Sequence, residues 1–183
     1  GWTLSAMRGS ASAAKPWASL ARLSVLGTGS SFPGEAISSE ALIDLVHARF
    51  DADCRKEAMA VARRIAIASR HVCRDFDARS ESARPGHGNA DLAARAVEGA
   101  LADAGLDIGE IGYLIGHTTT PEQPLPANVA HVADRLGYAG PHVELRQACT
   151  GFANALMIAT GLLAMPDARP VVIVGSETGS LYF

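Results

Sequence analysis

The stretch HVELRQACTGFANALMIATGLLAMPDARPVVIVG, residues 142–175, contains a strand, a helix and a second strand in succession. Its pattern predicts a strand over His142–Gln147 and a buried strand over Val171–Val174 that is closed by Gly175. The long apolar run between them predicts a helix over Cys149–Met165. Because strands joined through a helix run parallel, this stretch predicts a βαβ unit and an α/β fold.

The same alternation of strands and helices extends towards the amino terminus. We expect a strand over Leu23–Leu26 that ends in the turn Gly27-Thr28-Gly29, and a buried strand over Ile111–Ile115. Four helices are expected: one capped by Ser38 or Ser39, one from Asp53 to about Ile65, one capped by Asn89 and ended by Gly105, and one from Pro126 to Gly137. Residues 75–88 are polar and are expected to form a surface loop. The whole pattern predicts a mainly parallel sheet covered by helices on both faces.

Length and composition indicate one globular domain. The chain has 183 residues, of which 48% are hydrophobic and 19% are charged, and its formal net charge is −3. This charge provides no basic field for nucleic acid or anionic lipid, and no apolar run reaches the roughly 18 residues of a membrane helix. We therefore expect a protein that binds neither nucleic acid nor membrane.

The first residues differ from the rest in composition. No acidic residue precedes Glu35, and Arg8 and Lys15 lie among serines and alanines. We expect residues 1–20 to be a disordered extension or tag, and residues 21–183 to form the folded domain.

Three cysteines, Cys54, Cys73 and Cys149, form neither a disulfide framework nor the paired spacing of a zinc site. His71, which lies close to Cys73, also lacks a closing pair of ligands. Free thiols are typical of a reducing compartment, so we expect a cytoplasmic protein without a metal ion.

Cys149 is the best candidate for a chemical role. It lies where a buried strand is expected to meet the start of a helix, close to unpaired backbone N–H groups and the positive end of the helix dipole. This setting favours a nucleophilic thiolate, and Gly151 would allow a ligand or another backbone to approach closely. The alternative is an inert thiol in the core, since cysteine is among the residue types most often buried.

The residues from Arg22 to Glu177 resemble the amino-terminal half of a β-ketoacyl-acyl-carrier-protein synthase III, a condensing enzyme of the thiolase superfamily. The matching segments occur in the family's order. They are Val25-Leu26-Gly27-Thr28-Gly29-Ser30, Ile67-Ala68-Ser69-Arg70-His71, Ala102-Asp103-Ala104-Gly105-Leu106, Thr118-Thr119-Thr120 with Pro126, Ala148-Cys149-x-Gly151-Phe152 and Val172-Ile173-Val174-Gly175-Ser176-Glu177.

The resemblance implies a thiolase-like half-domain in which Cys149 accepts an acyl group from acyl-CoA and an enolate from a malonyl carrier protein then attacks it. It implies that Gly151 and Phe152 contact the acyl substrate, and that Arg64 contacts the nucleotide end of CoA. It further implies that Leu125 reaches across a homodimer to line the partner's acyl pocket. No cofactor is implied, because acyl-CoA is a substrate.

Two departures from the family leave alternatives open. Ala60 stands where the family has a tryptophan that accompanies Arg64. The family's second half, which carries a histidine and an asparagine that promote decarboxylation, is not in this chain. We therefore consider a truncated enzyme, a natural half that pairs with a second subunit, and a half-length relative. Separately, three functions stay open: condensation together with the second half, acyl transfer to a hydroxyl or amine, and a non-catalytic partner subunit. His117, His131 and His142 are each open as imidazole partners of the thiol.

Overall fold

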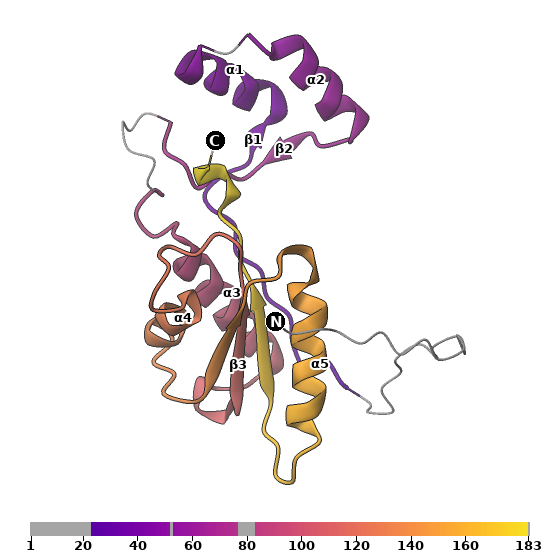
Figure 1. Ribbon diagram of the computed structural model, residues 1–183, viewed down its shortest axis with the longest axis vertical. Coiled ribbons are helices and arrows are strands. Elements are labelled where there is room, and N and C mark those ends of the chain that lie inside the picture. Colours follow the sequence, from indigo (N-terminus) through magenta and orange to yellow (C-terminus); the bar gives the residue numbers. More distant parts are fainter. Residues whose placement is uncertain (1–22, 52, 77–82, 183) are drawn as a thin grey trace, which may run out of the picture.

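A three-stranded parallel sheet forms the centre of the molecule (Figure 1). The computed structural model describes residues 23–51, 53–76 and 83–182, so the expected extension at residues 1–20 lies outside the described residues. The strands β3 (Tyr113–His117), β4 (His142–Leu145) and β5 (Val171–Gly175) occur in the order β4-β3-β5. At the carboxyl end of the sheet, His117 pairs with both Leu145 and Gly175.

Helices cover both faces of this sheet, as the sequence predicts. On one face, α3 (Asn89–Ala104) and α4 (Asn128–Arg135) pack on Leu114 and Val174. On the other face, α5 (Gly151–Leu163) packs on Ile115. Figure 1 shows α5 on the side of the strands opposite to α3 and α4. The α/β prediction is therefore confirmed.

Small side chains allow α5 to lie close to the central strand. Ala155 and Ala159 are 0% and 3% exposed, and both pack against the cluster around Ile115. Gly151 precedes Ala155 by one helical turn, and His117 follows Ile115 by two residues on the same face of β3. This packing therefore places His117 opposite Gly151, at the first turn of α5.

A helical hairpin lies beyond the carboxyl ends of the strands (Figure 1). It contains α1 (Ser39–Phe50) and α2 (Arg55–Arg64), and is closed by the antiparallel strands β1 (Ile37–Ser38) and β2 (Ser69–Arg70). The Ser38 side chain accepts a hydrogen bond of 3.1 Å from the Ala41 N–H and caps α1, which confirms one of the two expected caps.

The prediction of a strand over Leu23–Leu26 is wrong. This segment pairs with no strand in the described chain, and Val25 is 82% exposed. It runs along α3 instead, where the Thr28 N–H donates to Asp103 Oδ2 at 2.8 Å. A side chain at Gly27 would lie 2.6 Å from the Ala104 nitrogen. The absence of a side chain at this glycine therefore lets the segment lie directly against the helix.

Other boundaries also differ from the prediction, among them the start of α4 at Asn128 rather than Pro126 and the end of β4 at Leu145 rather than Gln147. The N-cap of α3 is Gly88, because the Asn89 side chain is buried and donates to Thr118 Oγ1 and the Thr120 carbonyl at 2.9 and 2.8 Å. The strand predicted over 111–115 lies at 113–117. A 3-10 turn precedes α5, so that helix begins at Gly151 rather than at Cys149. Two further 3-10 turns are η1 (Ile108–Glu110) and η3 (Gly179–Leu181).

Replacing Ala155 by leucine tests the close contact between α5 and β3. We expect Ala155→Leu to lower the free energy of unfolding by about 1–3 kcal/mol, because the larger side chain has no room against Ile115. The matched control is Met157→Leu on the exposed side of α5, which should leave stability unchanged. Urea denaturation followed by circular dichroism measures both, and equal stability of the two variants would contradict the close packing.

Candidate active site

Cys149 lies at a strained corner between a strand and a helix. It is the central residue of the 3-10 turn η2 (Ala148–Thr150), which joins the end of β4 to α5. Ala148 has a φ of 47°, in the left-handed region that costs a non-glycine residue about 1–2 kcal/mol. The Cys149 residue is exposed to solvent. Strain directly before an exposed nucleophile is a feature that functional sites commonly retain.

Hydrogen bonds hold this corner in place. The N–H and hydroxyl of Thr150 both donate to the Gln147 carbonyl, at 3.1 and 2.8 Å. The Asn154 side-chain amide donates to the Thr150 carbonyl at 3.0 Å. The first turn of α5, where the positive end of the helix dipole lies, therefore has a fixed orientation next to Cys149.

His117 fills the space beneath this turn. A side chain at Gly151 would lie 2.8 Å from His117 Nδ1, and one at Gly175 would overlap His117 Nε2. The imidazole ring also lies 6.4 Å from the Phe152 ring, measured between centroids. Gly151 is buried, with His117 rather than solvent on the side where a side chain would project. The two glycines therefore create the room that this histidine occupies.

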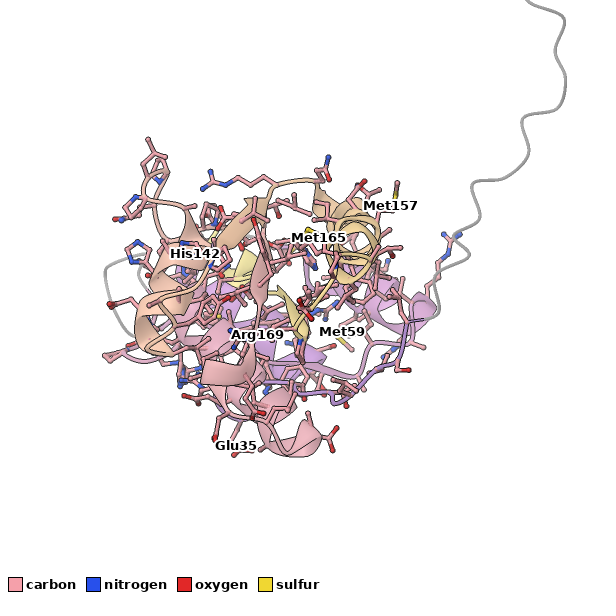
Figure 2. All side chains as sticks on the ribbon, turned by 90° about the horizontal axis from the view of Figure 1, so that it is seen from below. Glu35, Met59, His142, Met157, Met165 and Arg169 are labelled. Atoms are coloured by element: carbon pink, nitrogen blue, oxygen red, sulfur yellow. The ribbon has the colours of Figure 1, made fainter. Side chains whose placement is uncertain are left out.

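The other two candidate histidines lie elsewhere. His131 is in α4, on the opposite face of the sheet, and its Nε2 pairs with the Gln123 amide at 2.9 Å. His142 begins β4, and its Nδ1 pairs with the Gly140 carbonyl at 3.0 Å. Figure 2 shows His142 well apart from Met157 of α5, and its place at the start of β4 puts it at the amino end of the strand, whereas Cys149 follows the carboxyl end. Of the three, His117 is the one next to the first turn of α5, beside Cys149.

The loop between β3 and α4 presents an exposed apolar side chain at the same end of the sheet. Leu125 is 83% exposed, and Phe152, in the first turn of α5, is 53% exposed. The Glu177 carboxylate fixes the start of the loop by accepting from the N–H of Thr119 and the hydroxyls of Thr119 and Thr120, at 2.8, 2.9 and 2.7 Å. Sequence patterns alone give Glu177 no role, although its place just after β5 puts it at this edge.

Arg64 is the last residue of α2, in the hairpin beyond this edge of the sheet, and it is exposed. The structure thus places Arg64, Leu125, Cys149, Gly151 and Phe152 at the carboxyl end of the strands, where ligands of open α/β sheets bind. It shows contact between the Phe152 and His117 rings but records no contact of Arg64 with the other candidates.

Comparison with known proteins identifies relatives of one kind. The sequence matches no protein-family model. It is 31% identical over 157 residues to a β-ketoacyl-[acyl-carrier-protein] synthase III of Rhodospirillum centenum, covering 85% of this chain and 43% of that protein. The structure of AbyA1, a tetronic acid condensing enzyme, matches with a TM-score of 0.73 and 31% identity over 87% of this chain and 45% of that one. A priming β-ketosynthase of the R1128 polyketide pathway matches with a TM-score of 0.66 and 27% identity, over 84% of this chain and 41% of that one.

The chain is similar to the amino-terminal half of β-ketoacyl-acyl-carrier-protein synthase III. It spans less than half the length of the relatives it matches. In this synthase-III-like half, the described residues contain no helix long and apolar enough to cross a bilayer. Within the same residues, no group of three or more His, Cys, Asp or Glu side chains is arranged to hold a metal ion.

Thiol reactivity should separate Cys149 from the buried Cys73 of the synthase-III-like half. Burial raises the pKa of the Cys73 thiol, so this thiol stays protonated and shielded at pH 8, whereas Cys149 is exposed. We expect iodoacetamide to label Cys149 at least about tenfold faster than Cys73. Peptide mapping after short exposures measures the rates. Unfolding in guanidinium should equalise them, and equal rates in the folded protein would contradict this prediction.

The fit of His117 between two glycines is open to a double-mutant test. Gly175→Ala should lower the free energy of unfolding by about 1–3 kcal/mol, because the new methyl group overlaps the imidazole. Adding His117→Ala should recover part of that loss, since it removes the overlapped ring. Denaturant midpoints of the two single variants and the double variant provide the measurement. If the loss of stability in the double variant equals the sum of the losses in the two single variants, the imidazole ring does not occupy this position.

Proposed function

We propose that Cys149 accepts an acyl group from an acyl-CoA as a thioester, and that condensation with a malonyl thioester of the acyl carrier protein follows in the assembled enzyme. The observation that carries the proposal is the exposed thiol at the strained strand-to-helix corner. The similarity to synthase III and to priming ketosynthases supports a condensing reaction for fatty-acid or polyketide priming.

The corner between β4 and α5 suits the first step, which is the acylation of Cys149. The thiolate of Cys149 attacks the carbonyl carbon of the acyl-CoA, a C–S bond forms, and negative charge develops on the carbonyl oxygen. The backbone N–H of Cys149 is a suitable donor for that charge, and the positive end of the α5 dipole favours it. The tetrahedral intermediate then collapses, the bond to the coenzyme sulfur breaks, and the coenzyme leaves as a thiol after taking up a proton.

The second step needs groups that this chain does not supply. Loss of CO2 from the malonyl thioester leaves an enolate, which attacks the acyl group on Cys149 and restores the free thiol. The resemblance assigns promotion of that loss to a histidine and an asparagine in the family's second half. Because the chain spans 43% of the Rhodospirillum centenum protein, we assign condensation to an assembly that also supplies the groups of the family's second half.

The exposed apolar side chains support an acyl pocket that is completed by a second copy. Leu125 is 83% exposed on a loop whose start is fixed by hydrogen bonds, an arrangement that favours burial against a partner. We propose that Leu125 lines the pocket of the other subunit in a homodimer, that Phe152 and Gly151 shape the pocket around Cys149, and that Arg64 binds the nucleotide of CoA. We place the enzyme in the cytoplasm, where acyl-CoA is available.

Intact mass spectrometry tests the acylation step. After mixing with acetyl-, butyryl- and octanoyl-CoA, the full-length protein should gain the mass of an acyl group. Cys149→Ala should abolish this adduct, because the nucleophile is lost, while the matched variants Cys54→Ala and Cys73→Ala should retain it. An adduct that persists without Cys149, or no adduct with any donor, would refute the proposal.

Product analysis separates condensation from simple acyl transfer. With malonyl-acyl carrier protein, the acylated enzyme should release a β-ketoacyl thioester and CO2. Release of an ester or amide without CO2 would instead assign the chain to acyl transfer, the alternative that the same thiol permits.

A further inference from the structure

Arg146 joins the nucleophile segment to the tip of the loop that carries Leu125. Its guanidinium Nη2 donates to the Pro124 carbonyl at 3.2 Å. Glu177 and Asn89 fix the start of this loop, at Thr119 and Thr120, whereas the tip at Pro124 and Leu125 lies further along the chain. Among the described contacts, the bond from Arg146 is the one that holds the backbone of the tip.

A buried carboxylate orients Arg146. Glu144 Oε1 accepts from Arg146 Nε at 2.8 Å, and only 4% of the Glu144 side chain is exposed. Its second oxygen, Oε2, accepts from the Val129 N–H at 2.8 Å, at the start of α4. Both carboxylate oxygens are therefore engaged, and a charge-assisted bond at Nε fixes the guanidinium while its Nη2 reaches the loop.

The position of Arg146 in the chain gives this contact its significance. Arg146 directly follows β4 and precedes Cys149 by three residues, just before the strained corner at Ala148. One side chain thus connects the segment that leads to the thiol with the tip that presents Leu125. The planar fork of arginine can bond Glu144 and Pro124 together, which the single ammonium of lysine cannot do in the same geometry.

We propose that Arg146 is a positioning residue that fixes the Leu125 tip relative to the nucleophile strand, and thereby sets the selectivity for the acyl group. It acts through Leu125 and does not touch the substrate. The inference rests on the proposed function, in which Leu125 lines an acyl pocket. It follows that loss of the Arg146 bond loosens the tip and broadens the range of acyl chains accepted in the pocket of the other subunit, which Leu125 lines.

A double-mutant cycle tests the link in the full-length, assembled protein. We measure initial rates of Cys149 acylation with butyryl-CoA and octanoyl-CoA by intact mass. Arg146→Ala should change the ratio of the two rates by about threefold to tenfold, and Leu125→Ala should change it as well. In the Leu125→Ala background, Arg146→Ala should add no further change, because its effect passes through the leucine. Equal changes in both backgrounds, or an unchanged ratio, would overturn the proposal.

Two further variants separate the proposed role of Arg146 from misfolding and from the general effect of removing an arginine. Arg146→Lys keeps a positive charge beside Glu144, so it should preserve the fold and still shift the ratio as Arg146→Ala does. Arg169→Ala is the matched control: Arg169 donates to the carbonyls of Gly109 and Glu110, at the end of the sheet away from the loop, and its loss should leave the ratio unchanged. A normal ratio in a folded Arg146→Lys variant would contradict the proposed role.

Hydrogen exchange gives a readout that does not depend on acylation. Peptides that cover residues 121–127 should exchange faster in Arg146→Ala and Arg146→Lys than in the unmodified protein, while peptides from α3 should not change. Unchanged exchange at the tip would overturn the positioning role whatever the acylation results. Faster exchange without any acyl adduct on Cys149 would uphold the mechanical link and refute the proposed function.

Discussion

The close approach of α5 to the central strand β3 is the constraint on which the site depends. It requires the small residues Gly151, Ala155 and Ala159 on one side of the helix, spaced so that they face His117 and Ile115 in turn. A larger residue in this row would push the helix away from the sheet. With the helix held close, its first turn lies directly above the end of β3, and the connection from β4 must turn sharply to reach it.

That sharp connection accounts for the local geometry of Cys149. The chain leaves β4, passes through Ala148 at a φ of 47° and enters the helix after a single 3-10 turn. Cys149 is therefore exposed at the start of the helix, where the positive end of the helix dipole lies. Tertiary packing of the helix supports the strain at Ala148, because a free peptide would relax it.

Polar networks organise the loops around this corner. Asn89, which is buried, bonds Thr118 and Thr120 after β3, and Glu177 bonds the same loop from the end of β5. Glu144 and Arg146 connect β4 with the start of α4 and with the loop tip. The loops at the carboxyl end are thereby tied to the strands they follow, so the exposed Leu125 extends from a fixed base. Each of these polar groups is compensated by partners that come from distant parts of the sequence.

The sequence alone determined the α/β class and most helices, because apolar periodicity and caps such as Ser38 are local signals. It also singled out Cys149, since the order of strand, cysteine and helix places a thiol at a helix start whatever the detailed packing. Leu23–Leu26 has the composition of a strand yet forms none, because pairing requires a neighbouring strand that local sequence does not specify. The placement of His117 between two glycines and the reach of Arg146 to Pro124 were decided by the tertiary structure, since both depend on how close separate elements pack.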